Sequence, residues 1–141
     1  MCTKNDSPEK LKELRSKGHV LRKGYKVMDH RYNDWYSTFY SYYKWSLGWN
    51  QAHRTDNFCG RRRKGTNLTR TQPYVKKNHV VEAGFHVCLT RDGAKEWATD
   101  ISRIVPVWFY CDEVTAYQGS MFVIKGHVIT VSRVLVTKFP S

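Results

Sequence analysis

The stretch His127–Phe139, HVITVSRVLVTKF, is dominated by β-branched residues, and the stretch Arg103–Asp112, RIVPVWFYCD, is almost entirely apolar. β-Branched and aromatic side chains favour extended strands, so both stretches are predicted to be strands of a buried sheet. Pro106 lacks a backbone N–H and argues for an edge position or a bulge. The stretch Gly84–Leu89, GFHVCL, predicts a further short buried strand. The C-terminal half is therefore expected to supply the body of a sheet.

Two helices are expected beside this sheet. Ser7, Pro8 and Gly18 fit the cap, first and stop positions of a helix over residues 7–17. The other expected elements are a short helix near residues 91–99 capped by Thr90, strands at 25–28 and 121–125, and turns at 30–34 and 113–119. This order of elements predicts an α+β fold with a mainly antiparallel sheet, formed by one domain over residues 1–141.

Eight aromatic residues lie within the fifteen positions Trp35–Trp49. Their period-two alternation predicts a strand or hairpin, although Trp35, Phe39, Tyr42 and Trp49 would also share one stripe of a helix. The strand preference of Tyr, Phe, Trp and Thr favours the first interpretation. Most of these rings are expected to pack in the core. A minority is expected to form an exposed stacking platform beside Lys44, with Tyr36, Tyr40 and Tyr42 as the candidates.

The chain carries a net charge of +12, and this charge is concentrated in residues 1–24 and 52–79. Residues 52–79 lack apolar periodicity and are predicted to be a long basic surface loop inserted in the sheet domain, while residues 1–18 form an N-terminal helical arm. The cations of the loop, predicted to bind phosphate or nucleic acid, are Arg54, Arg61, Arg62, Arg63, Lys64, Arg70, Lys76 and Lys77. This excess of charge favours an anionic partner.

No complete catalytic signature occurs in the sequence. The histidines lack metal-site spacing and the four cysteines form no CxxC pair, so we expect neither a metal site nor a bound cofactor. Cys88 and Cys111 lie in apolar runs and are expected to be buried thiols. No signal peptide and no apolar run long enough to span a membrane are recognised, which predicts a cytoplasmic protein without a membrane partner.

The stretch GFHVCLTRDGAKEWATDISRIVPVWFYCDEVTAYQG, followed by VITVSRVLV, resembles small phage and bacterial proteins whose split β core is similar to that of ADP-ribosyltransferase-like folds. The resemblance covers residues 84–137. It implies an NAD-using enzyme whose catalytic residues would be His86 with Asp112 or Glu113. The chain departs from that pattern because no acid follows Glu113, where such enzymes carry a late catalytic glutamate. This departure favours a binding protein.

The sequence therefore predicts a small basic protein that binds an anionic partner, with nucleic acid or a phosphorylated nucleotide as the preferred class. The resemblance adds a viral setting, in which the protein would act in the host cytoplasm as a counter-defence or host-takeover factor. Two alternatives stay open. One is the NAD-using transferase, and the other is an interaction protein whose basic loop docks on an acidic protein surface.

Overall fold

The computed structural model describes residues 3–4, 6–38, 43–52, 72–76, 79–119 and 127–140, with the backbone alone described at 3–4, 72–76 and 79–83. The helices are α1 (Pro8–Arg15) and α2 (Arg91–Lys95), and a 3-10 turn, η1, spans Cys111–Glu113. The strands are β1 (Thr3–Lys4), β2 (Leu21–Arg31), β3 (Asp34–Ser37), β4 (Lys44–Trp45), β5 (Gly48–Gln51), β6 (Gln72–Lys76), β7 (His79–Ala83), β8 (Phe85–Cys88), β9 (Ser102–Tyr110), β10 (Ala116–Gln118), β11 (Val128–Val131) and β12 (Arg133–Val136).

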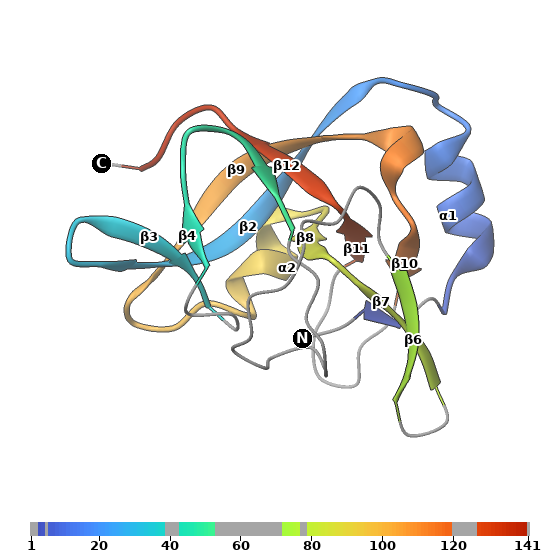
Figure 1. Ribbon diagram of the computed structural model, residues 1–141, viewed down its shortest axis with the longest axis horizontal. Coiled ribbons are helices and arrows are strands. Elements are labelled where there is room, and N and C mark those ends of the chain that lie inside the picture. Colours follow the sequence, from blue (N-terminus) through green and yellow to red (C-terminus); the bar gives the residue numbers. More distant parts are fainter. Residues whose placement is uncertain are drawn as a thin grey trace.

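The main sheet is antiparallel, and its strands follow the order β10-β11-β8-β2-β9-β12-β5. β3 and β4 extend the sheet from the far end of β2, where the β2–β3 hairpin projects from one side of the molecule (Figure 1). A second antiparallel sheet has the order β1-β7-β6. α1 lies on the opposite side from the β2–β3 hairpin, next to β10 (Figure 1).

The pairing of β2 with β9 determines which side chains enter the core. Nine consecutive residue pairs join the two strands, from Leu21↔Tyr110 to Asp29↔Ser102. Because successive side chains of a strand point to opposite faces, alternate residues of β9 lie inside. Val105, Val107 and Phe109 are fully buried, whereas the residues between them are only partly buried.

The strands curl around one large apolar cluster, and a smaller cluster lies on the outer face of the sheet. The large cluster joins the inner residues of β9 to those of β8, β11 and β12, and it includes Trp35 and Trp45. The smaller cluster contains Val27 and Cys88 beneath Ala94 of α2. α2 therefore covers part of the outer face, and it begins as predicted, with Thr90 Oγ1 accepting a hydrogen bond from the Gly93 N–H at 3.0 Å.

The α+β class and the antiparallel sheet are confirmed, as are the buried thiols of Cys88 and Cys111. In the described part of Trp35–Trp49 the aromatic block forms strands rather than a helix. The α1 helix occupies the predicted place, and Gly18 after it has a φ of +81°. Ser7, however, donates to Asp6 and makes no side-chain cap bond.

Several predicted boundaries are wrong. Residues 72–76, assigned to the basic loop, form β6, which is the last strand of its sheet among the described residues, a position in which Pro73 is tolerated. α2 ends at Lys95, before the predicted end near residue 99. The remaining corrections are a β2 much longer than 25–28, a strand (β10) within the expected turn 113–119, and a break at Ser132 that divides the long C-terminal strand into β11 and β12.

Pro106 does not lie on an edge strand, because β9 is flanked by β2 and β12. Its position is nevertheless explained by the sheet. β12 pairs with β9 only at Leu135↔Trp108 and ends at Val136, so Pro106 lies beyond that ladder. Among the described strands, this part of β9 pairs with β2 alone, and a residue without an N–H is tolerated there.

Gly24 of β2 marks the closest approach between the sheet and its core. A Cβ atom at this position would lie 2.4 Å from Val87 Cγ1 and 3.1 Å from Phe109 Cε1. We therefore expect Gly24→Ala to lower the free energy of unfolding by about 1–3 kcal/mol, measured by urea denaturation. In the Gly24→Ala/Val87→Ala double variant the loss should be smaller than the sum of the two single losses. Strict additivity would contradict a steric cause.

Candidate functional site

A row of side chains crosses four strands on the outer face of the main sheet. Lys23 of β2 lies opposite Trp108 of β9, Trp108 opposite Leu135 of β12, and Leu135 opposite Trp49 of β5. Directly opposed residues of antiparallel strands share a face, so these four side chains lie on one surface. Tyr110 is two positions along β9 from Trp108 and lies on the same surface.

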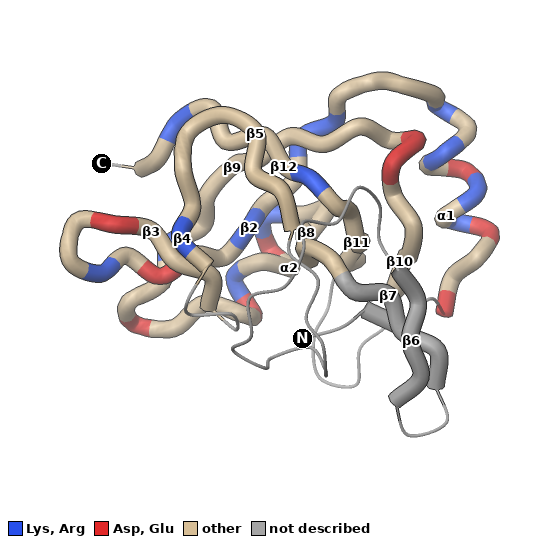
Figure 2. The backbone as a smooth tube through the Cα atoms, viewed as in Figure 1, with Lys and Arg blue, Asp and Glu red and all other residues tan. Residues whose placement is uncertain are grey.

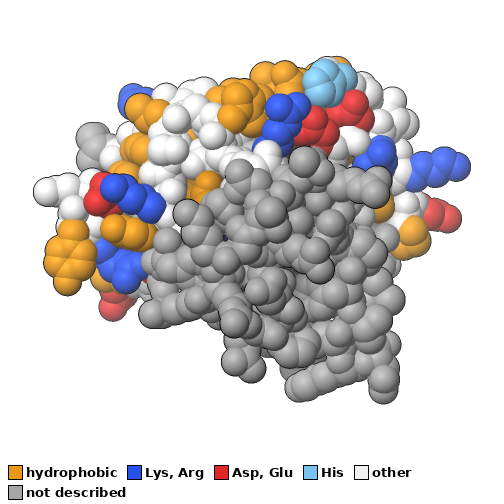
Figure 3. Space-filling model, viewed as in Figure 1, with side chains coloured by type: hydrophobic (Ala, Val, Ile, Leu, Met, Phe, Trp, Pro, Cys, Tyr) orange, Lys and Arg blue, Asp and Glu red, His pale blue; other side chains and the backbone are white. Residues whose placement is uncertain are grey.

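α2 covers one part of this outer face and leaves the rest accessible. The surface left accessible, called the aromatic face below, consists of Leu21, Lys23, Trp49, Trp108, Tyr110, Arg133 and Leu135. Trp49 is 42% exposed and Leu21 41% exposed. Figure 3 shows hydrophobic side chains beside basic, acidic and histidine side chains along the upper rim of the molecule. An accessible apolar patch with charged neighbours is typical of a binding surface.

Arg133 connects the two aromatic rings at one end of the aromatic face. The rings of Trp49 and Tyr110 are nearly parallel, with centroids 5.6 Å apart. The Arg133 guanidinium carbon lies 4.6 Å from the Trp49 centroid and 5.2 Å from that of Tyr110, within range of cation–π attraction. Its nitrogens donate to both carboxylate oxygens of Glu113, at 2.8 and 2.7 Å. The bonds to Glu113 raise the pKa of Arg133 and hold its side chain in place.

His19 occupies the other side of Tyr110. Its imidazole stacks on the Tyr110 ring with centroids 3.7 Å apart and planes 12° apart. His19 Nδ1 lies 3.0 and 3.2 Å from the two oxygens of Asp112. A carboxylate can only accept, so Nδ1 carries the hydrogen and donates. Figure 2 shows this acidic turn after β9 and the basic position at the start of β12.

The ligand atoms of His19, Asp112 and Glu113 all lie within 4.8 Å of one another, which is close enough for a metal ion. Each carboxylate is already engaged, however. Asp112 accepts from His19, and Glu113 accepts two hydrogen bonds from the Arg133 guanidinium. A cation at this place would have to displace Arg133, so the geometry favours a hydrogen-bonding site over a metal centre.

Of the predicted stacking residues, Tyr36 lies within the described part of the chain, and Tyr40 and Tyr42 lie outside it. Tyr36 is partly buried on β3, directly opposite Lys44 of β4, as the sequence suggested. The guanidinium carbon of Arg31 lies 4.7 Å from its ring centroid. Tyr32, at the adjacent turn, is 93% exposed. The β2–β3 hairpin therefore offers a second, smaller aromatic and basic surface.

Most of the predicted phosphate-binding cations lie outside the described residues. These are Arg54, Arg61, Arg62, Arg63, Lys64, Arg70 and Lys77. Lys76 is the last residue of β6, where the backbone alone is described. Their role in binding stays a prediction. The cations that the structure places on the aromatic face, Lys23 and Arg133, belong to a different part of the sequence.

The residues named for an NAD-using enzyme do not form one cluster in the described structure. His86 is buried on β8, opposite Thr130 of β11, and its Nε2 atom has no hydrogen-bond partner among the described residues. Burial and the nearby Lys26 hold the pKa of His86 well below its usual range. The described contacts of Asp112 and Glu113 run to His19 and Arg133 instead.

Lys26 is the other ionisable group inside the sheet. Its Nζ donates to the backbone carbonyl of His86 at 2.6 Å and lies 6.0 Å from the Trp45 ring centroid. The Lys26 residue is partly accessible, but its ammonium group is enclosed. This burial lowers the pKa of Lys26 to about 8. Enclosing the ammonium group lowers the stability of the folded state, because the charged group loses most of its hydration.

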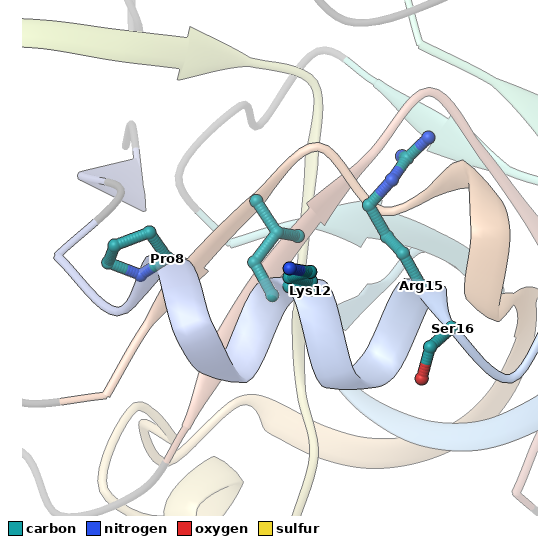
Figure 4. A pocket seen from close by; sticks show the side chains of 5 residues that line it. Pro8, Lys12, Arg15 and Ser16 are labelled. Carbon is teal, nitrogen blue, oxygen red and sulfur yellow. The ribbon is translucent and has the colours of Figure 1, made fainter.

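A hollow of about 410 Å³ lies beside α1 (Figure 4). Pro8, Leu11, Lys12, Arg15 and Ser16 line it. These residues follow one stripe of the helix and the turn after it. The Arg15 guanidinium donates to the Val114 carbonyl at 2.6 Å, which ties α1 to the segment after η1. All the residues that line the hollow thus come from one helix and the turn after it.

The sequence prediction missed the aromatic face, although part of its pattern was visible. In RIVPVWFYCD the alternate residues Ile104, Pro106, Trp108 and Tyr110 share one side of the strand. Both sides of this strand are apolar, so the pattern alone indicates a strand buried on both faces. His19 carried no such pattern, because its partner Asp112 is 93 positions away.

Comparison of the chain with protein-family models, curated proteins and solved structures gave no match. Among the described residues, none belongs to a helix that is both long and apolar enough to cross a membrane.

The enclosed Lys26 predicts a specific dependence of stability on pH. Its pKa falls from 10.5 to about 8 on folding, so between these values the unfolded state binds more protons and stability rises with pH. Relative to Lys26→Met, the free energy of unfolding of the native protein should therefore rise by about 1–3 kcal/mol from pH 8 to pH 10.5.

Urea denaturation at a series of pH values measures this difference. Lys23→Met, on the exposed face of the same strand, is the matched control for removal of a lysine. If native protein and Lys26→Met changed in parallel with pH, the ammonium group would not be enclosed in solution.

Proposed function

We propose that this protein binds single-stranded nucleic acid, with bases stacked on the aromatic face. The observation that carries the proposal is the row Lys23–Trp108–Leu135–Trp49, which stays accessible across four strands of the sheet. Exposed aromatic rings on a sheet surface, flanked by arginine and lysine, are a common means of holding unpaired bases. The net charge of +12 supports an anionic partner.

The charges at the rim of the aromatic face limit how a strand would lie on it. Lys23 is exposed, and the aromatic end of the row carries Arg133. Asp112 and Glu113 lie at the same end and would repel phosphate groups. The phosphates of a bound strand would therefore lie on the side of Lys23. The carboxylates would face the edges of the bases and accept hydrogen bonds from their N–H groups.

Truncation of Trp49 tests the stacking surface. Each stacked base contributes about 1–3 kcal/mol, so Trp49→Ala should weaken binding of an oligonucleotide of about twelve uridines by roughly 5–100-fold. Fluorescence anisotropy of the labelled oligonucleotide measures the affinity. Thermal unfolding of the same variant shows whether the fold is retained, as expected for a side chain that is 42% exposed.

Tyr32→Ala is the matched control, since it removes an exposed aromatic ring from the β2–β3 turn. It should leave binding unchanged. A selective loss in Tyr32→Ala or Tyr36→Ala would move the site to the β2–β3 hairpin. Absence of binding to any oligonucleotide, together with recovery of one acidic protein partner, would replace the proposal by the interaction protein.

The basic residues of the segment 52–79 give a separate prediction based on the sequence. Arg61→Glu with Arg63→Glu should weaken oligonucleotide binding and flatten its salt dependence between about 50 and 200 mM, because each phosphate contact releases a counterion. Titrations at the two salt concentrations measure the slope, and thermal unfolding serves as the control for folding. An unchanged slope would show that these arginines do not contact the ligand.

A further inference from the structure

The His19 ring makes the contacts with Tyr110 and Asp112 that a bound nucleobase would make. Its ring is planar, lies 3.7 Å from the Tyr110 centroid and is tilted by 12°. Its ring N–H points at the Asp112 carboxylate, whose two oxygens lie at 3.0 and 3.2 Å. A nucleobase recognised by stacking and by edge hydrogen bonds makes the same two kinds of contact.

We propose that Tyr110 and Asp112 form a base-binding subsite selective for guanine, and that His19 fills this subsite in the present structure. The inference rests on the proposed function and extends it to the identity of the base. His19 belongs to the short connection between α1 and β2, and its side chain is 56% exposed. It can therefore swing away from Tyr110 without opening the core.

The preference for guanine follows from the orientation of Asp112. Both of its oxygens face the ring that stacks on Tyr110. Guanine presents two adjacent N–H donors on its Watson–Crick edge, which match a carboxylate that accepts with both oxygens. Adenine presents a donor beside an acceptor nitrogen, and that acceptor would face a carboxylate oxygen. A matched pair of hydrogen bonds discriminates between bases by roughly 10–100-fold.

Arg133 supplies the third part of a nucleotide site. Its guanidinium lies 5.2 Å from the Tyr110 centroid and holds Glu113 through two hydrogen bonds. This fork geometry is the one in which arginine binds a phosphate group. Glu113 therefore stands in for the phosphate of a guanine nucleotide, as His19 stands in for its base. A ligand that replaced both would give Asp112 and Arg133 new partners and release the side chains of His19 and Glu113 to solvent.

The decisive experiment measures GMP and AMP binding by calorimetry, with Trp49 fluorescence as a second readout because Trp49 lies beside Tyr110. His19→Ala opens the subsite. This variant should bind GMP at least about 10-fold more tightly than the native protein does, and it should prefer GMP to AMP by a similar factor. His19→Ala/Asp112→Asn should lose this preference. Glu113→Ala should tighten GMP more than guanosine, because it frees Arg133 for the phosphate.

Uridine oligonucleotides separate the two proposals, since they test the aromatic face without guanine. If His19→Ala bound GMP and AMP equally, guanine selectivity would be overturned. If it bound neither while the native protein bound oligouridine, the subsite would be overturned and the aromatic face retained. If neither ligand class bound, both proposals would fail.

A second variant covers the case in which His19→Ala does not fold. Asp112→Asn, made in the otherwise native chain, should abolish a preference for UUG-repeat over UUA-repeat oligonucleotides, with thermal unfolding of the variant as the check that the fold is retained. Persistence of that preference would overturn the role of Asp112.

Discussion

The register of β2 against β9 is the constraint on which the rest of the structure depends. Nine consecutive pairs hold the two central strands together, and the same alternation sends Val107 and Phe109 inward and Trp108 and Tyr110 outward. A slip of one residue would exchange the two sets, placing aromatic hydroxyl and indole groups in the core and valines on the surface. Core packing and the aromatic face are therefore two consequences of one pairing.

The same register explains why Gly24 and Lys26 are tolerated on β2. Both lie on its inner side, where Gly24 allows Val87 to approach closely and Lys26 extends to the carbonyl of His86. β8 pairs with β2 at Tyr25↔Cys88, and β3 joins β2 from Met28 onward. Lys26 thus lies where β2 changes its neighbour, and its ammonium group provides a donor for a carbonyl of the diverging strand.

The sequence predicted the strands that are apolar on both faces, because composition alone identifies them. RIVPVWFYCD and GFHVCL were recognised for this reason. It could not predict where strands change partners. Nothing in HVITVSRVLVTKF marks Ser132 as the point at which pairing passes from β8 and β10 to β9 and β5. The length of β2 was underestimated because its polar residues interrupt the alternation of apolar residues that identifies a strand.

The candidate site was even less visible in the sequence, because it consists of contacts between distant segments. Asp112 and Glu113 were named only as what the resemblance implies, and their contacts are with His19 and Arg133, which come from distant parts of the chain. The sequence favoured the tyrosines of the aromatic block as stacking residues. Trp49 is instead the exposed ring, and it lies on β5, the last strand of the main sheet among the described residues.

The polar groups around Tyr110 are paired with one another. Each carboxylate of the turn has a cationic or N–H partner, and each partner also contacts an aromatic ring. Such pairs hold the side chains in position. A ligand with the same arrangement of donors and acceptors could replace one member of each pair. An accessible apolar surface of this kind gains free energy when a partner covers it, since covering removes aromatic area from water. The pairing of charges around exposed rings thus argues for a recognition surface rather than an incidental gap in the fold.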